Sequence, residues 1–169
     1  LSVWGELSPP TSLTAAVSMF APANCGGVIS VSAHNRRGGI TEYSNFGTGI
    51  TLSAPGGDLP VGDLIYSTAY TGTTVPEEPT YMYGRGTSFS APLVSGVAAL
   101  ILARNPLLTG GRVQDIISGT TRKFPTTSLC SNGECGSGML DAAAAVGSTF
   151  PNGQPPPNAF EVVEFYRAD

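Results

Sequence analysis

Ser88 is the residue best placed by sequence to act as a nucleophile, because it ends the run 84–88, Gly-Arg-Gly-Thr-Ser, ahead of a long apolar segment. The glycines predict a turn, and the apolar segment predicts a buried helix. A helix N-terminus offers unpaired N–H groups and partial positive charge, which would stabilise an oxyanion beside the serine. The pattern therefore indicates acyl transfer at Ser88, with backbone support from Thr87 and Ser88. The alternative is a capping role, since Ser, Thr and Gly are ordinary helix caps.

The chain contains one histidine, His34, and so offers one imidazole as a general base. His34 follows a predicted strand and begins a turn rich in Gly and Arg. We expect it to face solvent rather than to act in catalysis. We also expect Asp58 and Asp63 to be surface loop carboxylates and Asn45 to bind backbone groups.

The three cysteines are unevenly spaced. Cys130 and Cys135 lie close together in a stretch rich in Gly, Ser and Asn, and a disulfide between them would indicate an oxidising compartment. The alternative is two free thiols. A metal site is disfavoured, because CxxC spacing is absent and His34 is far away along the chain.

The elements around Ser88 favour an α/β fold, because short strands precede helices. Near-alternating apolar residues and flanking turn residues predict four strands, at 27–33, 50–54, 64–68 and 80–83. Residues 72–79 are expected to form a surface loop. Helices are expected at 88–104, at 112–119 with Thr109 as cap, and at 140–146. The first helix is apolar nearly all round, and we expect residues 93, 97, 100 and 101 on one buried face.

Composition excludes several classes of protein. The 169 residues are 41% hydrophobic and 12% charged, with a formal net charge of −4, which suits one folded domain. Eight basic residues against twelve acidic ones, with no basic stripe, argue against a nucleic-acid partner. No apolar run approaches the roughly 18–20 residues of a membrane helix, and the first residues do not resemble a signal peptide.

Four motifs, in order, resemble the subtilisin-like serine proteases, and secreted bacterial members in particular. In chain order, they are the PANC…VI.V segment at residues 20–31 and the YSN.G…APGGD stretch at 44–57. The nucleophile motif GTS-x-x-x-P-x-V-x-G follows at 86–96, and the closing CG.G..DA motif lies at 135–142. The resemblance covers about residues 20 to 146. It implies a partial subtilisin-like fold, mainly a parallel sheet with a central buried helix after the nucleophile Ser88. It also implies a secreted protein and is compatible with calcium binding, although no D-x-D-x-D loop places a metal ion.

The remaining motifs of that family are missing from the sequence. The family order of the triad is Asp, His, Ser, and this chain has neither a D-[ST]-G nor an HGTH motif. Cys25 lacks the upstream cysteine that usually pairs with it in the family. We therefore expect residues 20–149 to be the C-terminal half of a catalytic domain, after an unassigned leader at 1–19. Residues 150–169 are expected to be a Pro-rich linker and the start of a truncated further domain.

Three functions follow from these expectations. The first is a serine endopeptidase, or part of one, that hydrolyses protein or peptide substrates through an acyl-enzyme on Ser88. The second is a weak ester hydrolase that uses Ser88 without a full triad. The third is a catalytically incomplete half that associates with a missing N-terminal partner or with itself, through an exposed sheet edge and an uncovered apolar helix.

Overall fold

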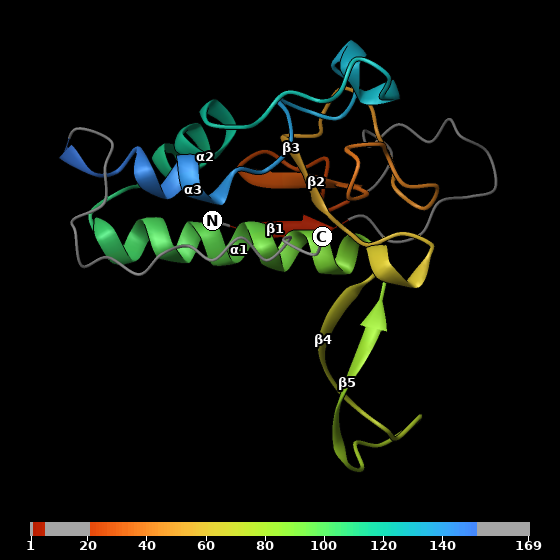
Figure 1. The fold of residues 1–169 in the computed structure, drawn as a ribbon. Helices are drawn as coiled ribbons and strands as arrows, with labels where there is room; N and C mark the ends of the chain where they lie inside the picture. Colours follow the sequence, from red (N-terminus) through yellow and green to blue (C-terminus); the bar gives the residue numbers. More distant parts are fainter. Residues whose placement is uncertain (1, 6–20, 152–169) are drawn as a thin grey trace.

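The computed structural model describes residues 2–5 and 21–151 (Figure 1). Its strands are β1 Ser2–Gly5, β2 Val28–His34, β3 Leu52–Pro55, β4 Ile65–Tyr70 and β5 Pro79–Gly84. Its helices are α1 Thr87–Arg104, α2 Gly110–Gly119 and α3 Ala142–Gly147, with short 3-10 turns η2 Val61–Asp63 and η3 Leu129–Asn132. Most of the expected linker and truncated domain at 150–169, and most of the leader at 1–19, lie outside the described residues.

The first three strands form a parallel sheet in the order β1-β2-β3. Gly5 pairs with Val31 and Ala33 pairs with Ala54, so the carboxyl ends of β2 and β3 lie at one edge. The parallel sheet and the strands at 27–33 and 50–54 are thus confirmed. Strand β1 was not expected, because four residues carry no period and are fixed by pairing with a strand more than twenty residues away.

Helix α1 packs on this sheet and also contacts α2 and α3 (Figure 1). The hydrophobic core lies between these elements, and its fully buried members include Ile29, Val31, Leu52, Val94, Ile101 and Ile117. Helix α2 begins after Thr109, whose side chain accepts a hydrogen bond from the Arg112 N–H as expected. Helix α3 is capped by Asp141, which accepts from the Ala144 N–H at 2.8 Å.

The expected buried face of α1 is wrong in part. Val97 and Ile101 are buried, but Leu93 is 40% exposed and Leu100 is 52% exposed. Because apolar residues lie on every side of this helix, the spacing of its apolar residues does not indicate which face is buried. The structure buries the neighbouring face through Val94 and leaves an apolar stripe open, in the part of the chain that is described.

Among the described helices, α1 satisfies the length and composition expected of a membrane span, with 18 residues and a mean hydropathy of 1.4. The expectation that no segment reaches this length therefore needs correction. Serines and a glycine interrupt the apolar residues of α1, so its longest unbroken apolar run is much shorter than the helix. The core helix of a folded domain can have the same length and composition.

Strands β4 and β5 form a separate two-stranded antiparallel ribbon, with Ile65 opposite Gly84 and Tyr70 opposite Pro79. The ribbon extends away from the sheet and the helices, beside the N-terminal end of α1 (Figure 1). The two strands and the loop between them agree with the sequence prediction. Their pairing into a projecting ribbon was not expected.

Candidate functional site

The candidate site begins at Gly86, the N-cap residue of α1, whose φ of 147° favours glycine. Its N–H donates a hydrogen bond of 2.8 Å to the carbonyl oxygen of Gly56, just after β3. The Phe89 N–H donates back to the Gly86 carbonyl at 3.0 Å. These contacts place the first turn of α1 at the carboxyl edge of the parallel sheet, where α/β proteins commonly bind ligands.

Three hydroxyl side chains lie in this first turn, and they differ in exposure. Thr87 is 2% exposed, and Ser90 is fully buried and donates to the Ala54 carbonyl at 3.1 Å. Ser88 is exposed. Because Gly86 holds the N-cap position, Ser88 lies inside the helix and is not its cap, which removes the capping alternative for this residue. Thr87 is able to contribute only backbone groups to a site at the surface.

The turn before Ser88 is packed tightly against the strand ends. A Cβ at Gly56 would lie 2.6 Å from the Ala33 Cβ and from the Tyr43 hydroxyl oxygen, and 2.9 Å from the Ser90 Oγ. The Tyr43 hydroxyl donates a hydrogen bond to the Gly57 carbonyl. Burial raises the pKa of the Tyr43 phenol above its ordinary value, so the hydroxyl keeps the proton that it donates.

The charge nearest to Ser88 in sequence, on Arg85, is compensated by neighbouring groups. The Arg85 guanidinium forms an ion pair with Glu42 at 2.9 Å and approaches Asp58 at 4.0 Å. It also lies over the Tyr43 ring, 5.8 Å from its centroid. Asp58, which is partly buried, accepts in addition from the Asn35 side-chain amide at 3.1 Å. Asp58 therefore has a structural role in the loop, and Arg85 is held beside the start of α1.

His34 is not exposed, so the expectation that it faces solvent is wrong. It is 5% exposed, its Nδ1 lies 2.9 Å from the Asn35 carbonyl oxygen, and its ring meets Phe124 edge-on at 6.5 Å. Burial lowers the pKa of the imidazole below its ordinary value, so the ring is neutral near pH 7. The sequence placed it in a turn, whereas it is the last residue of β2 and points into the interior.

The position of His34 also excludes a hydrogen bond to Ser88. Ala33 contacts the α1 side of the sheet, and successive side chains of a strand point to opposite faces, so His34 lies on the face away from α1. Its Nε2 has no hydrogen-bond partner among the described residues, nor do the buried hydroxyls of Ser30 and Ser32 on the same face. Among the described residues, the structure therefore does not bring Ser88 and His34 together.

The other polar residues considered from sequence lie in varied environments. Asp63 ends the short turn η2 and is partly exposed, with its carbonyl accepting from the Asp58 N–H at 3.0 Å. Asn45 is 2% exposed. The backbone-binding role expected of its side chain stays a prediction.

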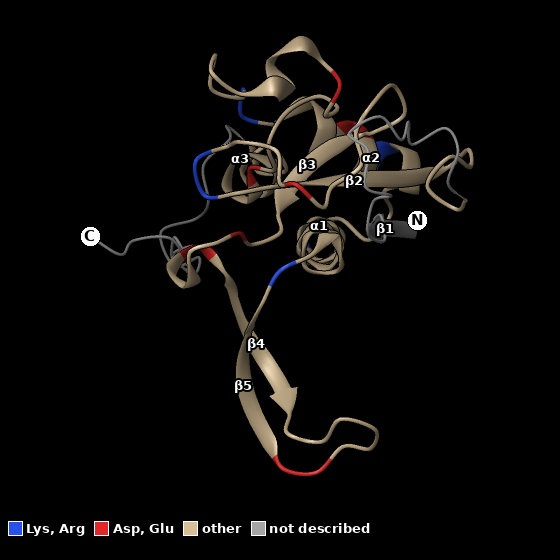
Figure 2. Cartoon of the chain, turned by 90° about the vertical axis from the view of Figure 1, so that its right-hand side faces the viewer, with Lys and Arg blue, Asp and Glu red and all other residues tan. Residues whose placement is uncertain are grey.

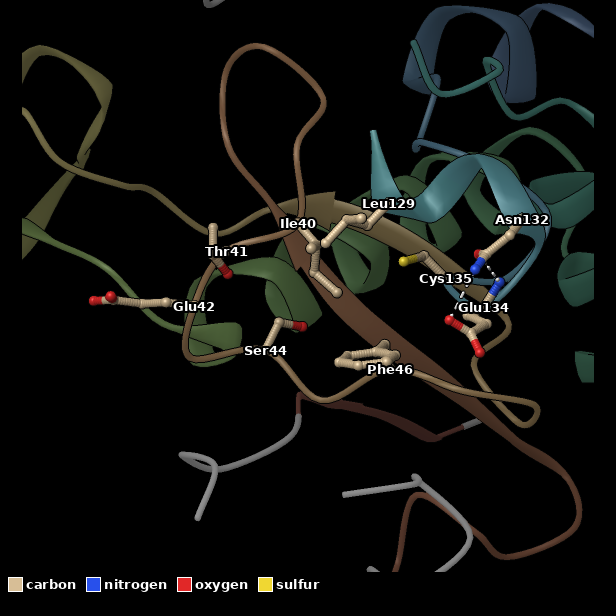
Figure 3. Close-up of a pocket in the computed structure, with 9 residues that line it drawn as sticks. All are labelled: Ile40, Thr41, Glu42, Ser44, Phe46, Leu129, Asn132, Glu134 and Cys135. Carbon is tan, nitrogen blue, oxygen red and sulfur yellow. Dashed lines mark hydrogen bonds between the residues drawn. The ribbon is translucent and has the colours of Figure 1, made fainter. Parts of the chain in front are cut away.

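The described part of the structure contains a cavity of about 320 Å³ (Figure 3). It is formed by the 40–46 loop and the 129–135 segment, and Ser88 does not line it. Its lining residues are Ile40, Thr41, Glu42, Ser44, Phe46, Leu129, Asn132, Glu134 and Cys135. Figure 3 shows the Glu42 carboxylate directed away from the other lining side chains, which agrees with its ion pair to Arg85.

The structure joins Cys130 and Cys135 in a disulfide, with a Cα–Cα distance of 5.1 Å. Cys25 is a free, exposed thiol. Within residues 2–5 and 21–151, no three His, Cys, Asp or Glu side chains gather as metal ligands.

A parallel sheet, a helix that starts at its carboxyl edge and an exposed serine in the first turn of that helix define an α/β protein with a candidate serine nucleophile. The model of the Subtilase family matches residues 10–143. The chain therefore belongs to the subtilase family, and its partial subtilisin-like α/β fold is confirmed.

Individual relatives agree with this assignment. An extracellular protease of Xanthomonas campestris pv. campestris is 44% identical over 131 residues, covering 77% of this chain and 21% of that protein. An extracellular basic protease of Dichelobacter nodosus is 38% identical over 133 residues, covering 74% of this chain and 20% of that protein. A solved structure of a protease from Pseudoalteromonas arctica aligns with a TM-score of 0.70 and 41% identity, over 77% of this chain and 38% of that one. The chain thus spans about a fifth of the length of these two curated relatives.

Proposed function

We propose that this chain is the nucleophile-bearing part of a secreted subtilisin-like serine peptidase. The observation that carries the proposal is the exposed Ser88 in the first turn of α1, at the carboxyl edge of the parallel sheet. Membership of the subtilase family and the proteases among the relatives support it. The extracellular relatives and the Cys130–Cys135 disulfide support a secreted location.

In the proposed reaction, the Ser88 Oγ attacks the carbonyl carbon of a peptide bond and gives its proton to a base. The carbonyl oxygen gains negative charge, and the backbone N–H groups at the start of α1, from Thr87 and Ser88, stabilise it together with the helix dipole. The C–N bond then breaks, and the amine leaves with a proton. Water hydrolyses the acyl-enzyme and restores the Ser88 hydroxyl.

The base for this reaction is not His34, which is the chain's one histidine and lies on the other face of the sheet. We propose that the triad Asp and His belong to a further part of the protease that packs on the exposed side of α1. The apolar stripe with Leu93 and Leu100 supports such packing, because exposed leucines on a core helix favour burial. In subtilisin the loss of the triad costs about 10⁶ in turnover, so the chain alone should be a very poor peptidase.

A chimera tests the role of Ser88. The segment of the Xanthomonas campestris protease that aligns with this chain is replaced by this chain's residues, so that the rest of that protease supplies the other half. We expect the chimera to hydrolyse casein and the Ser88→Ala form to lose about 10⁶ in turnover. Ser95→Ala is the matched control, since Ser95 is exposed on the same helix and bonds to the Ala91 carbonyl at 3.2 Å.

Equal activity of the Ser88→Ala chimera and its parent would refute the assignment. The isolated chain gives a second measurement that needs no partner, the turnover of a nitrophenyl ester. If Ser88 is activated by its helix alone, slow ester hydrolysis disappears in Ser88→Ala and is unchanged in His34→Ala. Loss of turnover in both variants would instead show that His34 acts as a base.

A further inference from the structure

The β4–β5 ribbon carries four tyrosines on one face. Opposite residues in an antiparallel pair point to the same side, and the register places Tyr66 opposite Tyr83, Thr68 opposite Tyr81 and Tyr70 opposite Pro79. Since side chains alternate along each strand, all six residues share a face. The four tyrosines are 59%, 53%, 61% and 56% exposed, in the order Tyr66, Tyr70, Tyr81 and Tyr83. We call this set the tyrosine face.

Three rings of the tyrosine face form a continuous aromatic surface. Tyr66 stacks on Tyr81 with a centroid distance of 5.4 Å and an interplanar angle of 24°. It also lies 4.7 Å from Tyr83, with the rings tilted by 39°. Hydration of a row of half-exposed aromatic rings is unfavourable in free energy, and such exposed patches commonly mark interaction sites. Within the described residues, nothing covers this face.

The charge around the tyrosine face has one sign. Glu77 and Glu78 lie in the loop that joins β4 to β5, and Asp63 ends the turn η2, two residues before β4. Figure 2 shows acidic positions in the loop at the far end of the ribbon. Residues 59–84 contain no Lys or Arg. Arg85, at the end next to α1, is already paired with Glu42. The faces of tyrosine rings also carry negative electrostatic potential, so the whole ribbon attracts cations.

We propose that the tyrosine face binds a cationic, extended segment of the polypeptide substrate, at a distance from the bond that is cleaved. This inference rests on the proposed function, since it assigns the site a class of substrate. Lys and Arg side chains would stack on the rings and pair with Glu77 and Glu78. A second copy of the chain is a poor occupant, because both ribbons are acidic and the net charge of each chain is −4.

The geometry of the ribbon suits an extended chain that leads to Ser88. Strand β5 ends at Gly84, and α1 begins at Thr87, so the ribbon projects from the site itself. Six residues of strand measure about 20 Å, which corresponds to about six residues of an extended peptide. Among the described residues β4 and β5 pair only with each other, so each has an outer edge where a peptide backbone could add.

The test measures binding and not hydrolysis. The chain, carrying Ser88→Ala, is titrated into a fluorescein-labelled peptide of alternating Arg and Thr, and fluorescence polarisation is recorded at low and at high salt. We expect binding of this peptide, at least about tenfold weaker binding of a peptide with Glu in place of Arg, and weakening by salt. The double variant Tyr66→Ser/Tyr81→Ser should weaken binding about tenfold or more.

Three variants separate the tyrosine face from a general effect of charge or folding. Tyr66→Phe/Tyr81→Phe should bind within about twofold of the parent, because phenylalanine keeps the aromatic face. Met82→Ser should also be unchanged, since Met82 is 55% exposed on the opposite face of the ribbon. Glu77→Gln/Glu78→Gln lies in an exposed loop and should reduce both affinity and salt dependence, even if the serine variants fail to fold.

Several results would overturn the inference. Equal binding of the Arg and Glu peptides would show that charge does not select the ligand, and unchanged binding by Tyr66→Ser/Tyr81→Ser would place the ligand elsewhere. Binding of a neutral cellulose oligosaccharide in place of the Arg peptide, with loss in the Phe variant, would make the face a carbohydrate site. The assay needs no catalysis, so the result is independent of the Ser88 chimera, and either proposal can fail alone.

Discussion

The Gly86 N–H donates a 2.8 Å hydrogen bond to the Gly56 carbonyl oxygen, and this one contact joins the start of α1 to the end of β3. It brings two glycine-rich segments together that are thirty residues apart in sequence. Glycine is required at position 86 by the backbone conformation, because its φ is 147°. At position 56 glycine is required by packing, because a side chain would collide with its neighbours. The exposed Ser88 is therefore positioned by backbone packing at the sheet edge.

Substitution of Gly56 should destabilise the fold through overpacking. The Cβ of Gly56→Ala would lie 2.6 Å from the Ala33 Cβ and from the Tyr43 hydroxyl oxygen. We expect a loss of about 1–3 kcal/mol in the free energy of unfolding, measured by urea denaturation. Gly96→Ala is the matched control, because a Cβ at Gly96, inside α1, meets nothing within 4 Å.

That control should stabilise the chain by about 0.5–1 kcal/mol, since alanine lowers the entropy of the unfolded chain and suits a helix. A Gly56→Ala variant as stable as the Gly96→Ala variant would show that the strand ends yield easily to a methyl group.

Removal of the Ser90 hydroxyl should lower stability, whereas removal of the Ser88 hydroxyl should not. Ser90 is fully buried and donates to the Ala54 carbonyl at 3.1 Å, so Ser90→Ala removes a buried hydrogen bond between α1 and β3. We expect a cost of about 0.5–1.5 kcal/mol in the free energy of unfolding. Ser88→Ala, at an exposed position, should change it by less than about 0.5 kcal/mol. The free energies of unfolding of the two variants, measured by heat or urea, test this order. A larger loss in Ser88→Ala than in Ser90→Ala would contradict it.

Local patterns predicted the elements around Ser88, because their signals lie within a few residues of one another. Glycines before Ser88 and an apolar run after it placed the start of α1 within one residue of its observed position at Thr87. Thr109 was identified as a cap for the same reason. The spacing of Cys130 and Cys135 likewise allowed a short disulfide to be anticipated.

Features that depend on distant partners were missed. Strand β1 exists only through its register with β2, and the burial of His34 depends on Phe124, which lies ninety residues further along the chain. Which face of α1 is exposed depends on which face packs on the sheet. Because α1 is apolar on every side, its sequence does not indicate that face. The tyrosine face needed the register of β4 against β5, although each strand was predicted by itself.

The burial of His34 should make stability depend on pH. Burial, with a smaller contribution from the nearby Arg122 charge, lowers the pKa of the imidazole in the folded chain, while the hydrogen bond to Asn35 opposes the shift. As the pH falls, His34 of the unfolded chain takes up a proton at about pH 6.5, which is a higher pH than in the folded chain. The stabilisation is therefore complete above about pH 6.5 and is lost as pH falls from there toward the lower pKa of the folded state.

The measurement is the free energy of unfolding of the parent and of His34→Gln between about pH 8 and pH 5. One histidine contributes a slope of at most about 1.4 kcal/mol per pH unit, and the difference between the two proteins removes the shared contribution of the carboxylates. The parent should lose more stability than the variant as pH falls. Parallel curves would mean that the folded chain protonates His34 as readily as the unfolded chain does.

The disulfide should stabilise the 129–135 segment, which forms one wall of the cavity in Figure 3. Closure of so short a loop is worth about 2 kcal/mol by the entropy of the unfolded chain, so reduction should lower the melting temperature. Differential scanning calorimetry with and without dithiothreitol measures the shift. The Cys130→Ser/Cys135→Ser variant is the control, because it should melt at the same temperature in both conditions.

The three cysteines should also differ in their reaction with iodoacetamide. Cys25 is free and exposed, so it should be modified in the unreduced native chain, whereas Cys130 and Cys135 should react only after reduction. Modification of all three cysteines before reduction would show that the disulfide does not form in solution.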